Sequence, residues 1–221
     1  MSKKAQIFPS LMSADLMNLE NVIKSLEPHC DGFHIDIMDN HFVPNITWGA
    51  DITNQIAKIC KKPLLVHLMV EKPKDIIMKL KLTPDSVISF HLEAVENPQE
   101  IINVITTAGY TPSIAIKPGT QIEALCQWLV KGIPHVLLMS VEPGFSGQTF
   151  LPESNARLKE LTAYRTKHKK EFIICMDGGI NQDNIGNLHR LGAEQFAVSS
   201  ALFGAKEPLK ALKELYDCSF V

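Results

Sequence analysis

Short apolar runs alternate along the chain with longer segments in which apolar residues recur every three or four positions. Eight of the runs have the length and composition of buried strands. Their spacing of roughly 20–35 residues is what a strand, a helix and two connections require in a parallel sheet. The predicted strands are residues 5–8, 32–38, 64–69, 86–91, 113–117, 135–140, 172–177 and 195–200.

The segments between the runs carry the signals of helix ends. The first of them begins with Ser13, which we predict as an N-cap. Residues 97–109 have Pro98 at the start and Gly109 at the end, an asymmetry that is typical of helices. Basic residues gather toward the end of 153–170, where the helix dipole favours positive charge.

Eight strands that alternate with about eight helices predict an α/β fold, a single-domain (β/α)8 barrel over residues 1–221. No Pro/Gly/Ser-rich linker, low-complexity tract or charge block divides the chain. A doubly wound open sheet, which more often has five or six strands, is the alternative. In a barrel, catalytic residues come from the carboxyl ends of the strands and the loops that follow them.

Composition narrows the classes of partner. With 22 basic and 24 acidic side chains the chain lacks the basic footprint of a nucleic-acid-binding protein. It has no apolar stretch of the roughly 18–20 residues that span a membrane, and its first residues lack the apolar core of a signal peptide. The five cysteines are scattered and form no CxxC pair, which favours a reduced, cytoplasmic protein. We also expect a homo-oligomer.

One predicted strand, 32–38, carries ionisable residues in an unusual place. Its apolar positions alternate with His34 and Asp36, and residues two apart in a strand point the same way. The imidazole and the carboxylate therefore lie side by side on one face. For an isolated strand the simplest interpretation is a half-exposed antiparallel strand with its polar face in water. A functional interpretation requires partners from elsewhere in the chain.

Two other predicted strands supply such partners. His67 lies within an apolar run, and Asp177 ends another. Taken singly, a histidine in an apolar strand is usually a core residue, and an aspartate before Gly-Gly is usually part of a turn. Together at one rim of a barrel, they offer the nitrogen and oxygen ligands that suit Zn²⁺, Mn²⁺, Fe²⁺ or Co²⁺. We predict one divalent ion, with zinc preferred, bound by His34, Asp36, His67 and Asp177.

Other features of the same rim suggest a ligand pocket. Stretches with glycine or serine follow the last three predicted strands, at 142–148, 177–180 and 198–203. Their backbone N–H groups can approach a ligand closely, and this part of a barrel often binds phosphate. Methionine is usually core filler. Three methionines near the ends of three different strands nevertheless predict an apolar cover over the metal; they are Met38, Met69 and Met139.

Six motifs resemble the successive motifs of the ribulose-phosphate 3-epimerase family over nearly the whole chain. They are PSLMSAD (9–15), HIDIMDNHFVPN (34–45), HLMVEKP (67–73), EPGFSGQTF (142–150), DGGI (177–180) and SSALFGA (199–205). The resemblance implies a metal-dependent (β/α)8 barrel, an isomerase of the pentose phosphate pathway. Such an enzyme inverts C3 of a phosphorylated ketopentose, converting D-ribulose 5-phosphate to D-xylulose 5-phosphate.

The resemblance also implies roles for individual residues. Asp36 is the expected proton acceptor and Asp177 the expected donor, and both would bind the metal together with the two histidines. Ser10 and His67 would contact the sugar. The residues expected to line the substrate or hold its phosphate are Met38, Met69, Met139, Gly144, Phe145, Ser146, Gly147, Gly178, Gly179, Ser199 and Ser200.

The chain departs from the usual family pattern at two of these positions, where Ser146 and Ser199 replace glycines. Backbone N–H donors survive both changes, so phosphate binding is still expected, although the added side chain of Ser199 would narrow the pocket.

The expected chemistry explains why two carboxylates are needed. Epimerisation beside a ketone removes a proton from one face of carbon and returns one to the other, so two acid/base groups must flank the sugar. A divalent cation that touches the C2 and C3 oxygens stabilises the enediolate. Two alternatives stay open: a D-allulose 6-phosphate 3-epimerase of the same family, and a non-catalytic phosphosugar-binding barrel.

Overall fold

The eight strands form one parallel sheet that curves into a barrel. The computed structural model describes residues 4–219, in which the strands follow the order β1-β8-β7-β6-β5-β4-β3-β2. They are β1 (Gln6–Pro9), β2 (Phe33–Met38), β3 (Leu64–Met69), β4 (Val87–His91), β5 (Thr111–Ile116), β6 (His135–Met139), β7 (Ile173–Asp177) and β8 (Gln195–Val198). Each boundary lies within about two residues of its prediction, and the predicted (β/α)8 barrel is confirmed.

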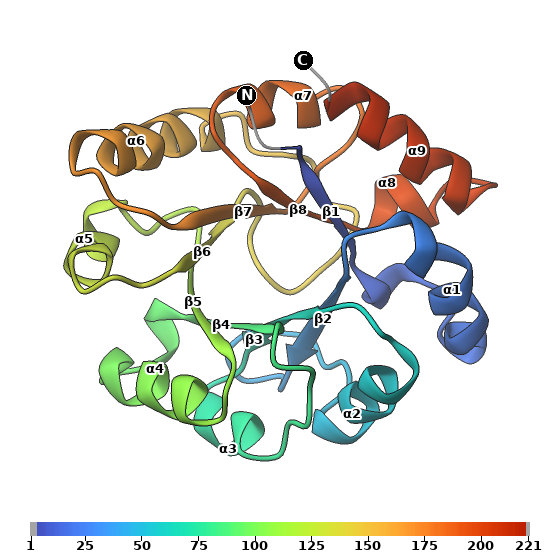
Figure 1. The fold of residues 1–221 in the computed structure, drawn as a ribbon, viewed down its shortest axis with the longest axis horizontal. Helices are drawn as coiled ribbons and strands as arrows, with labels where there is room; N and C mark the ends of the chain where they lie inside the picture. Colours follow the sequence, from blue (N-terminus) through green and yellow to red (C-terminus); the bar gives the residue numbers. More distant parts are fainter. Residues whose placement is uncertain (1–3, 220–221) are drawn as a thin grey trace.

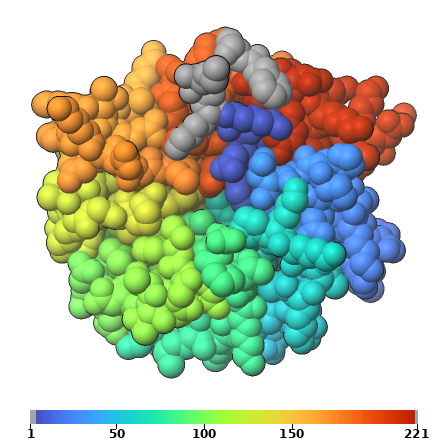
Figure 2. All heavy atoms as spheres, viewed as in Figure 1, coloured from blue at the N-terminus to red at the C-terminus, as the bar shows by residue number. Residues whose placement is uncertain are grey.

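Helices surround the strands (Figure 1), and in Figure 2 the colours of the sequence follow one another around the molecule. They are α1 (Leu19–Leu26), α2 (Ala50–Ile59), α3 (Pro73–Ile77), α4 (Pro98–Thr107), α5 (Glu123–Val130), α6 (Ser154–Lys167), α7 (Ile185–Arg190), α8 (Ser200–Phe203) and α9 (Pro208–Ser219). Short 3₁₀ turns are η1 (Leu11–Ser13), η2 (Leu16–Asn18), η3 (Glu27–His29) and η4 (Leu92–Ala94). Within residues 4–219, none of these helices has the length and apolar character that a bilayer crossing demands.

The start of the first helix differs from the prediction. Ser13 does not cap a helix, because the chain first makes two 3₁₀ turns and α1 begins only at Leu19. The carboxylate of Asp15 caps the second of these turns by accepting a hydrogen bond from the backbone N–H of Met17. The hydroxyl of Ser13 points instead to residues far away in the sequence.

Strand β2 is buried on both faces, so the interpretation as a half-exposed antiparallel strand is wrong. Phe33, Ile35 and Ile37 pack in the main apolar core with residues of the surrounding helices. His34 and Asp36 are also buried, with 0% and 3% of their surface exposed. β2 pairs in parallel with β3, and all six of its residues are buried, as is typical of strands in parallel sheets.

The barrel is joined most sparsely between β1 and β2. Among the described residues this seam has a single parallel bridge, between Ser10 and His34, directly after β1. The hydroxyl of Ser10 donates a hydrogen bond of 2.6 Å to Asp36 Oδ2 across the same seam. The barrel therefore closes at the end where the predicted site lies.

A separate polar cluster lies at the amino ends of the strands. Buried His135, the first residue of β6, has Nδ1 2.7 Å from the hydroxyl of Ser113 and Nε2 2.8 Å from Oε1 of Gln195. The amide of Gln195 in turn donates to Gln6 Oε1 at 2.9 Å. A neutral imidazole satisfies both contacts, and burial lowers the pKa of His135 to about 4.

This cluster predicts an acid-sensitive contribution to stability. Because the folded pKa of His135 lies below the ordinary value of 6.5, the unfolded chain binds more protons as the pH falls through this interval. Between pH 7 and about pH 5, the wild type should lose about 2 kcal/mol more unfolding free energy than a His135→Gln variant. Urea unfolding at both pH values measures this difference, and parallel losses in the two proteins would contradict it.

Candidate active site

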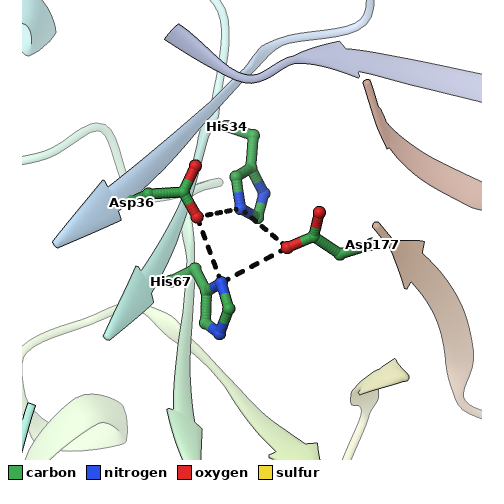
Figure 3. Close-up of side chains that lie close together, drawn as sticks. All are labelled: His34, Asp36, His67 and Asp177. Atoms are coloured by element: carbon green, nitrogen blue, oxygen red, sulfur yellow. Dashed lines mark hydrogen bonds and ion pairs between the residues drawn. The ribbon is translucent and has the colours of Figure 1, made fainter. Parts of the chain in front are cut away.

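Four side chains, three of them buried and that of Asp177 partly exposed, meet at the carboxyl end of the barrel (Figure 3). The register of β2 and β3 places Asp36 directly opposite His67, and that of β6 and β7 places Met139 opposite Asp177. His34 lies two residues before Asp36 on the same face of β2. Side chains from three strands therefore face one another.

The contacts within this group are short. Nε2 of His34 lies 3.0 Å from Asp36 Oδ1 and 3.4 Å from Asp177 Oδ2. Nδ1 of His67 lies 3.2 Å and 3.3 Å from the same two oxygens. One oxygen of each carboxylate thus faces both imidazoles.

Burial and charge oppose each other in this group. Burial by itself lowers the pKa of His34, but Asp36 and Asp177 outweigh it and raise that pKa to about 10. Burial likewise favours the protonated form of Asp36, yet His34 and His67 hold its pKa well below the usual range. The pKa of Asp177 is lowered in the same way, chiefly by His34. Two ionised carboxylates therefore require positive charge between them, from protons or from a cation.

The four side chains fit a divalent cation. Their ligand atoms all lie within 4.8 Å of one another. The contacts of 3.0–3.4 Å resemble the edge of about 3.4 Å that separates tetrahedral ligands placed about 2.1 Å from a central ion. Two imidazole nitrogens and two carboxylate oxygens also form a donor set that first-row divalent metals prefer. The predicted group of ligands is therefore brought together as a candidate metal centre.

Hydrogen bonds from neighbouring side chains orient Asp36. The hydroxyl of Ser10 donates to Oδ2, which leaves Oδ1 facing the imidazoles. Thr47 donates to the backbone carbonyl of Asp36 at 2.6 Å and accepts from the backbone N–H of Met38 at 3.0 Å. The end of β2 is thereby tied to the loop that follows it.

A hollow opens in front of the cluster. His34 lies beneath its wall, whereas the other three ligand residues line it. Every residue predicted to contact the substrate also lines this hollow: Ser10, Met38, His67, Met69, Met139, Gly144, Phe145, Ser146, Gly147, Gly178, Gly179, Ser199 and Ser200. The structure thus gathers into one place residues that are scattered along the sequence.

Sequence reasoning missed Ser13, which contacts two residues that line this hollow. Its hydroxyl lies 2.6 Å from that of Ser146 and accepts from that of Ser199 at 2.8 Å, while Ser146 and Ser199 are 3.2 Å apart. The three hydroxyls form a triangle that joins the loops after β1, β6 and β8. A second serine three residues after Ser10 was the only signal for it.

His91 and Glu93 were also missed. His91 ends β4 at the same rim, and its Nε2 lies 2.8 Å from Nε2 of His67. Its Nδ1 lies 3.1 Å from Glu93 Oε2. Burial lowers the pKa of His91 to about 4. Burial raises the pKa of Glu93, but hydrogen bonds lower this pKa to about 2, and the bond from His91 contributes most to the lowering. The rule that polar residues at strand ends mark a barrel site applied to His91 as well.

A (β/α)8 barrel with a histidine–aspartate cluster at its carboxyl end has the form of a metal-assisted enzyme. A model of the ribulose-phosphate 3-epimerase family matches residues 6–203. A ribulose-phosphate 3-epimerase of Methanocaldococcus jannaschii is 36% identical over 97% of this chain and 91% of the relative. One from Bacillus subtilis is 34% identical over 95% of this chain and 97% of the relative.

The chain belongs to the ribulose-phosphate 3-epimerase family, and it is an enzyme of that kind. Two solved structures share its fold at low identity. KGPDC of Streptococcus mutans has a TM-score of 0.67, with 12% identity over 98% of each chain. Thiamine phosphate pyrophosphorylase of Pyrococcus furiosus has a TM-score of 0.67, with 16% identity over 99% of this chain and 96% of that one.

The cluster predicts how the protein binds metal. Loss of a residue that only supports a ligand typically lowers metal affinity about 10–100-fold. His67→Ala removes a ligand itself, so its affinity for Zn²⁺ should fall by more than this. The control is His135→Gln, which changes a buried histidine at the other end of the barrel. Competition with a chromophoric chelator measures both. Wild-type affinity in His67→Ala would show that this histidine is not a ligand.

Proposed function

We propose that this enzyme interconverts D-ribulose 5-phosphate and D-xylulose 5-phosphate by moving protons at C3 with Asp36 and Asp177. One observation carries the proposal: the two carboxylates come from β2 and β7, which are not neighbours in the barrel, and both face the hollow. A sugar that lies across the hollow would have one carboxylate on each side. The relatives named above are ribulose-phosphate 3-epimerases, which favours a pentose over a hexose phosphate.

We assign Asp36 as the ionised carboxylate that acts in the first step. The Ser10 hydroxyl donates to its carboxylate, which stabilises the ionised form, and its side chain is only 5% exposed. Asp177 is more open to the hollow, at 16%. In the direction from D-ribulose 5-phosphate, Asp36 takes the C3 proton, and Asp177, which must first take up a proton from solvent, delivers it to the opposite face. The two residues exchange these roles in the reverse direction.

The four ligand residues would hold a single divalent ion, for which we propose zinc because four nitrogen and oxygen ligands suit it. Such an ion supplies Lewis-acid stabilisation of the negative charge that develops on the substrate oxygens. His34 and His67 present their nitrogens to that position, and the carboxylates balance the charge.

The methionines support the proposed chemistry by excluding water. Met38 and Met69 are 3% and 2% exposed and pack with Val43, and Met139 is 2% exposed in a neighbouring cluster. All three line the hollow beside the carboxylates. Flexible apolar side chains can adapt to a sugar while keeping bulk water from the reacting carbon.

The phosphate group is proposed to lie against backbone N–H groups of the loops after β6, β7 and β8. Gly178 and Gly179 have φ values of +114° and +66°, a region that favours glycine. A Cβ on Gly179 would lie 2.4 Å from the backbone N of Phe150, in the loop after β6. Two of the loops are therefore packed together through a position that tolerates no side chain.

This packing predicts the effect of Gly179→Ala. The added methyl group must push the loop after β6 away, so KM for D-ribulose 5-phosphate should rise by about tenfold or more, the scale of a misplaced binding group. Gly119→Ala is the matched control, because a Cβ there meets no atom within 4 Å and φ is ordinary. Steady-state kinetics measure both. An unchanged KM in Gly179→Ala would place the phosphate elsewhere.

Solvent isotope exchange separates the two aspartates. Asp177→Asn removes the second acid/base group, so epimerisation should slow by about 10²–10⁴-fold. Asp36 could still take the C3 proton of D-ribulose 5-phosphate and return deuterium to the same face. In D₂O, this variant should therefore exchange C3 hydrogen in D-ribulose 5-phosphate but not in its epimer, as NMR would show.

The comparison requires matched metal content, and Asp183→Asn, an exposed aspartate in the loop after β7, serves as the control. Normal epimerisation by Asp177→Asn, or equal exchange in both epimers, would exclude Asp177 as the second acid/base group.

A further inference from the structure

His67 has a polar partner on the side away from the carboxylates. Its Nδ1 faces Asp36 and Asp177, and its Nε2 lies 2.8 Å from Nε2 of His91. The other nitrogen of His91 lies 3.1 Å from Glu93 Oε2. The chain of contacts therefore runs from the candidate metal centre through two imidazoles to a carboxylate.

The direction of each hydrogen bond follows from the valence of the rings. A carboxylate only accepts, so His91 carries its proton on Nδ1 and donates it to Glu93. A neutral His91 then has a lone pair on Nε2, which accepts the Nε2–H of His67. A lone pair of His67 is left on Nδ1, where it faces the cation position. With a cation bound between His67 and the carboxylates, this assignment satisfies all three groups with two neutral imidazoles.

Glu93 itself is held firmly. Its Oε1 accepts from the backbone N–H of Lys117 at 2.8 Å and from the hydroxyl of Thr120. The guanidinium of Arg157 donates to the carbonyl oxygens of Lys117 and Thr120 at 2.8 and 3.0 Å, and to that of Met139 at 2.9 Å. Both carboxylate oxygens of Glu93 are thus in use, and the loop that binds it is fixed to α6 and β6.

The two imidazoles of this chain of contacts are kept away from water, whereas Glu93 lies at its exposed end. His91 is fully buried, and the ring of Phe42 lies 4.8 Å from its ring. The ammonium group of Lys117 in turn lies over the ring of Phe42, 4.0 Å from its centre. Hydrogen bonds in such an environment are stronger than in water.

The second histidine of the cluster has no comparable partner. Nδ1 of His34 is buried and has no hydrogen-bond partner among residues 4–219. The support is therefore specific to His67 rather than a general property of this part of the barrel.

We propose that Glu93, acting through His91, positions His67 by fixing its ring and keeping its Nδ1 lone pair toward the metal. This inference rests on the proposed metal centre and adds two positioning residues to it. Partners of this kind typically contribute about 10–100-fold to metal affinity.

Zn²⁺ affinity of matched variants tests the proposal. Glu93→Gln keeps the shape of the side chain but replaces one acceptor oxygen with an NH₂ group. This group must then face either the Nδ1–H of His91 or the backbone N–H of Lys117, both of which are donors. Its Zn²⁺ affinity should fall about 10–100-fold. Thr120→Val removes one of the bonds that hold Glu93 and should have a smaller effect. Glu100→Gln, in an exposed ion pair with Lys74, is the control and should retain wild-type affinity.

A structural measurement accompanies the affinities. In ¹⁵N NMR spectra of the Zn²⁺-loaded wild type, His91 should carry its proton on Nδ1 and His67 on Nε2, and Glu93→Gln should disturb both. A proton on Nε2 of His91 would overturn the proposal without any variant. So would wild-type Zn²⁺ affinity in both Glu93→Gln and His91→Phe. A wild-type protein that binds no Zn²⁺ would instead contradict the metal centre itself.

Discussion

The site depends on balancing charge among two carboxylates and two imidazoles that are almost removed from water. Asp36 alone in this position would be costly to bury, because an unpaired carboxylate loses its hydration without compensation. The histidines of β2 and β3 hold the pKa of both aspartates low, and the aspartates raise that of His34 in return. The folded site therefore requires positive charge between the two carboxylates.

The register of the sheet is what brings these opposite charges together. Asp36 lies opposite His67 only in the observed pairing of β2 with β3. A slip by one residue would turn His34 and Asp36 toward the helices and Ile35 toward the barrel axis. The apolar core would then contain two unpaired polar groups. The bridge and hydrogen bond of Ser10 secure this register where β1 meets β2 most sparsely.

The rim of the barrel is connected through contacts that run between loops. Glu93 links β4 to the loop after β5, and Arg157 joins that loop to the end of β6 beside Met139. Gly179 packs against the backbone at Phe150, and the three serine hydroxyls join the loops after β1, β6 and β8. Since these residues share partners, the effects of substituting them will not be additive.

The sequence by itself determined the strands and the four residues of the candidate metal centre, because local patterns encode both. His34 alternates with apolar neighbours, and Asp177 is the polar end of an apolar run. The tertiary structure decided which side chains meet. Ser13 looked like a helix cap, yet it contacts Ser146, 133 residues away. His91 reads locally as a core histidine, and only its place beside His67 gives it a partner. Such contacts depend on strand register and on the paths of loops, which no local pattern contains.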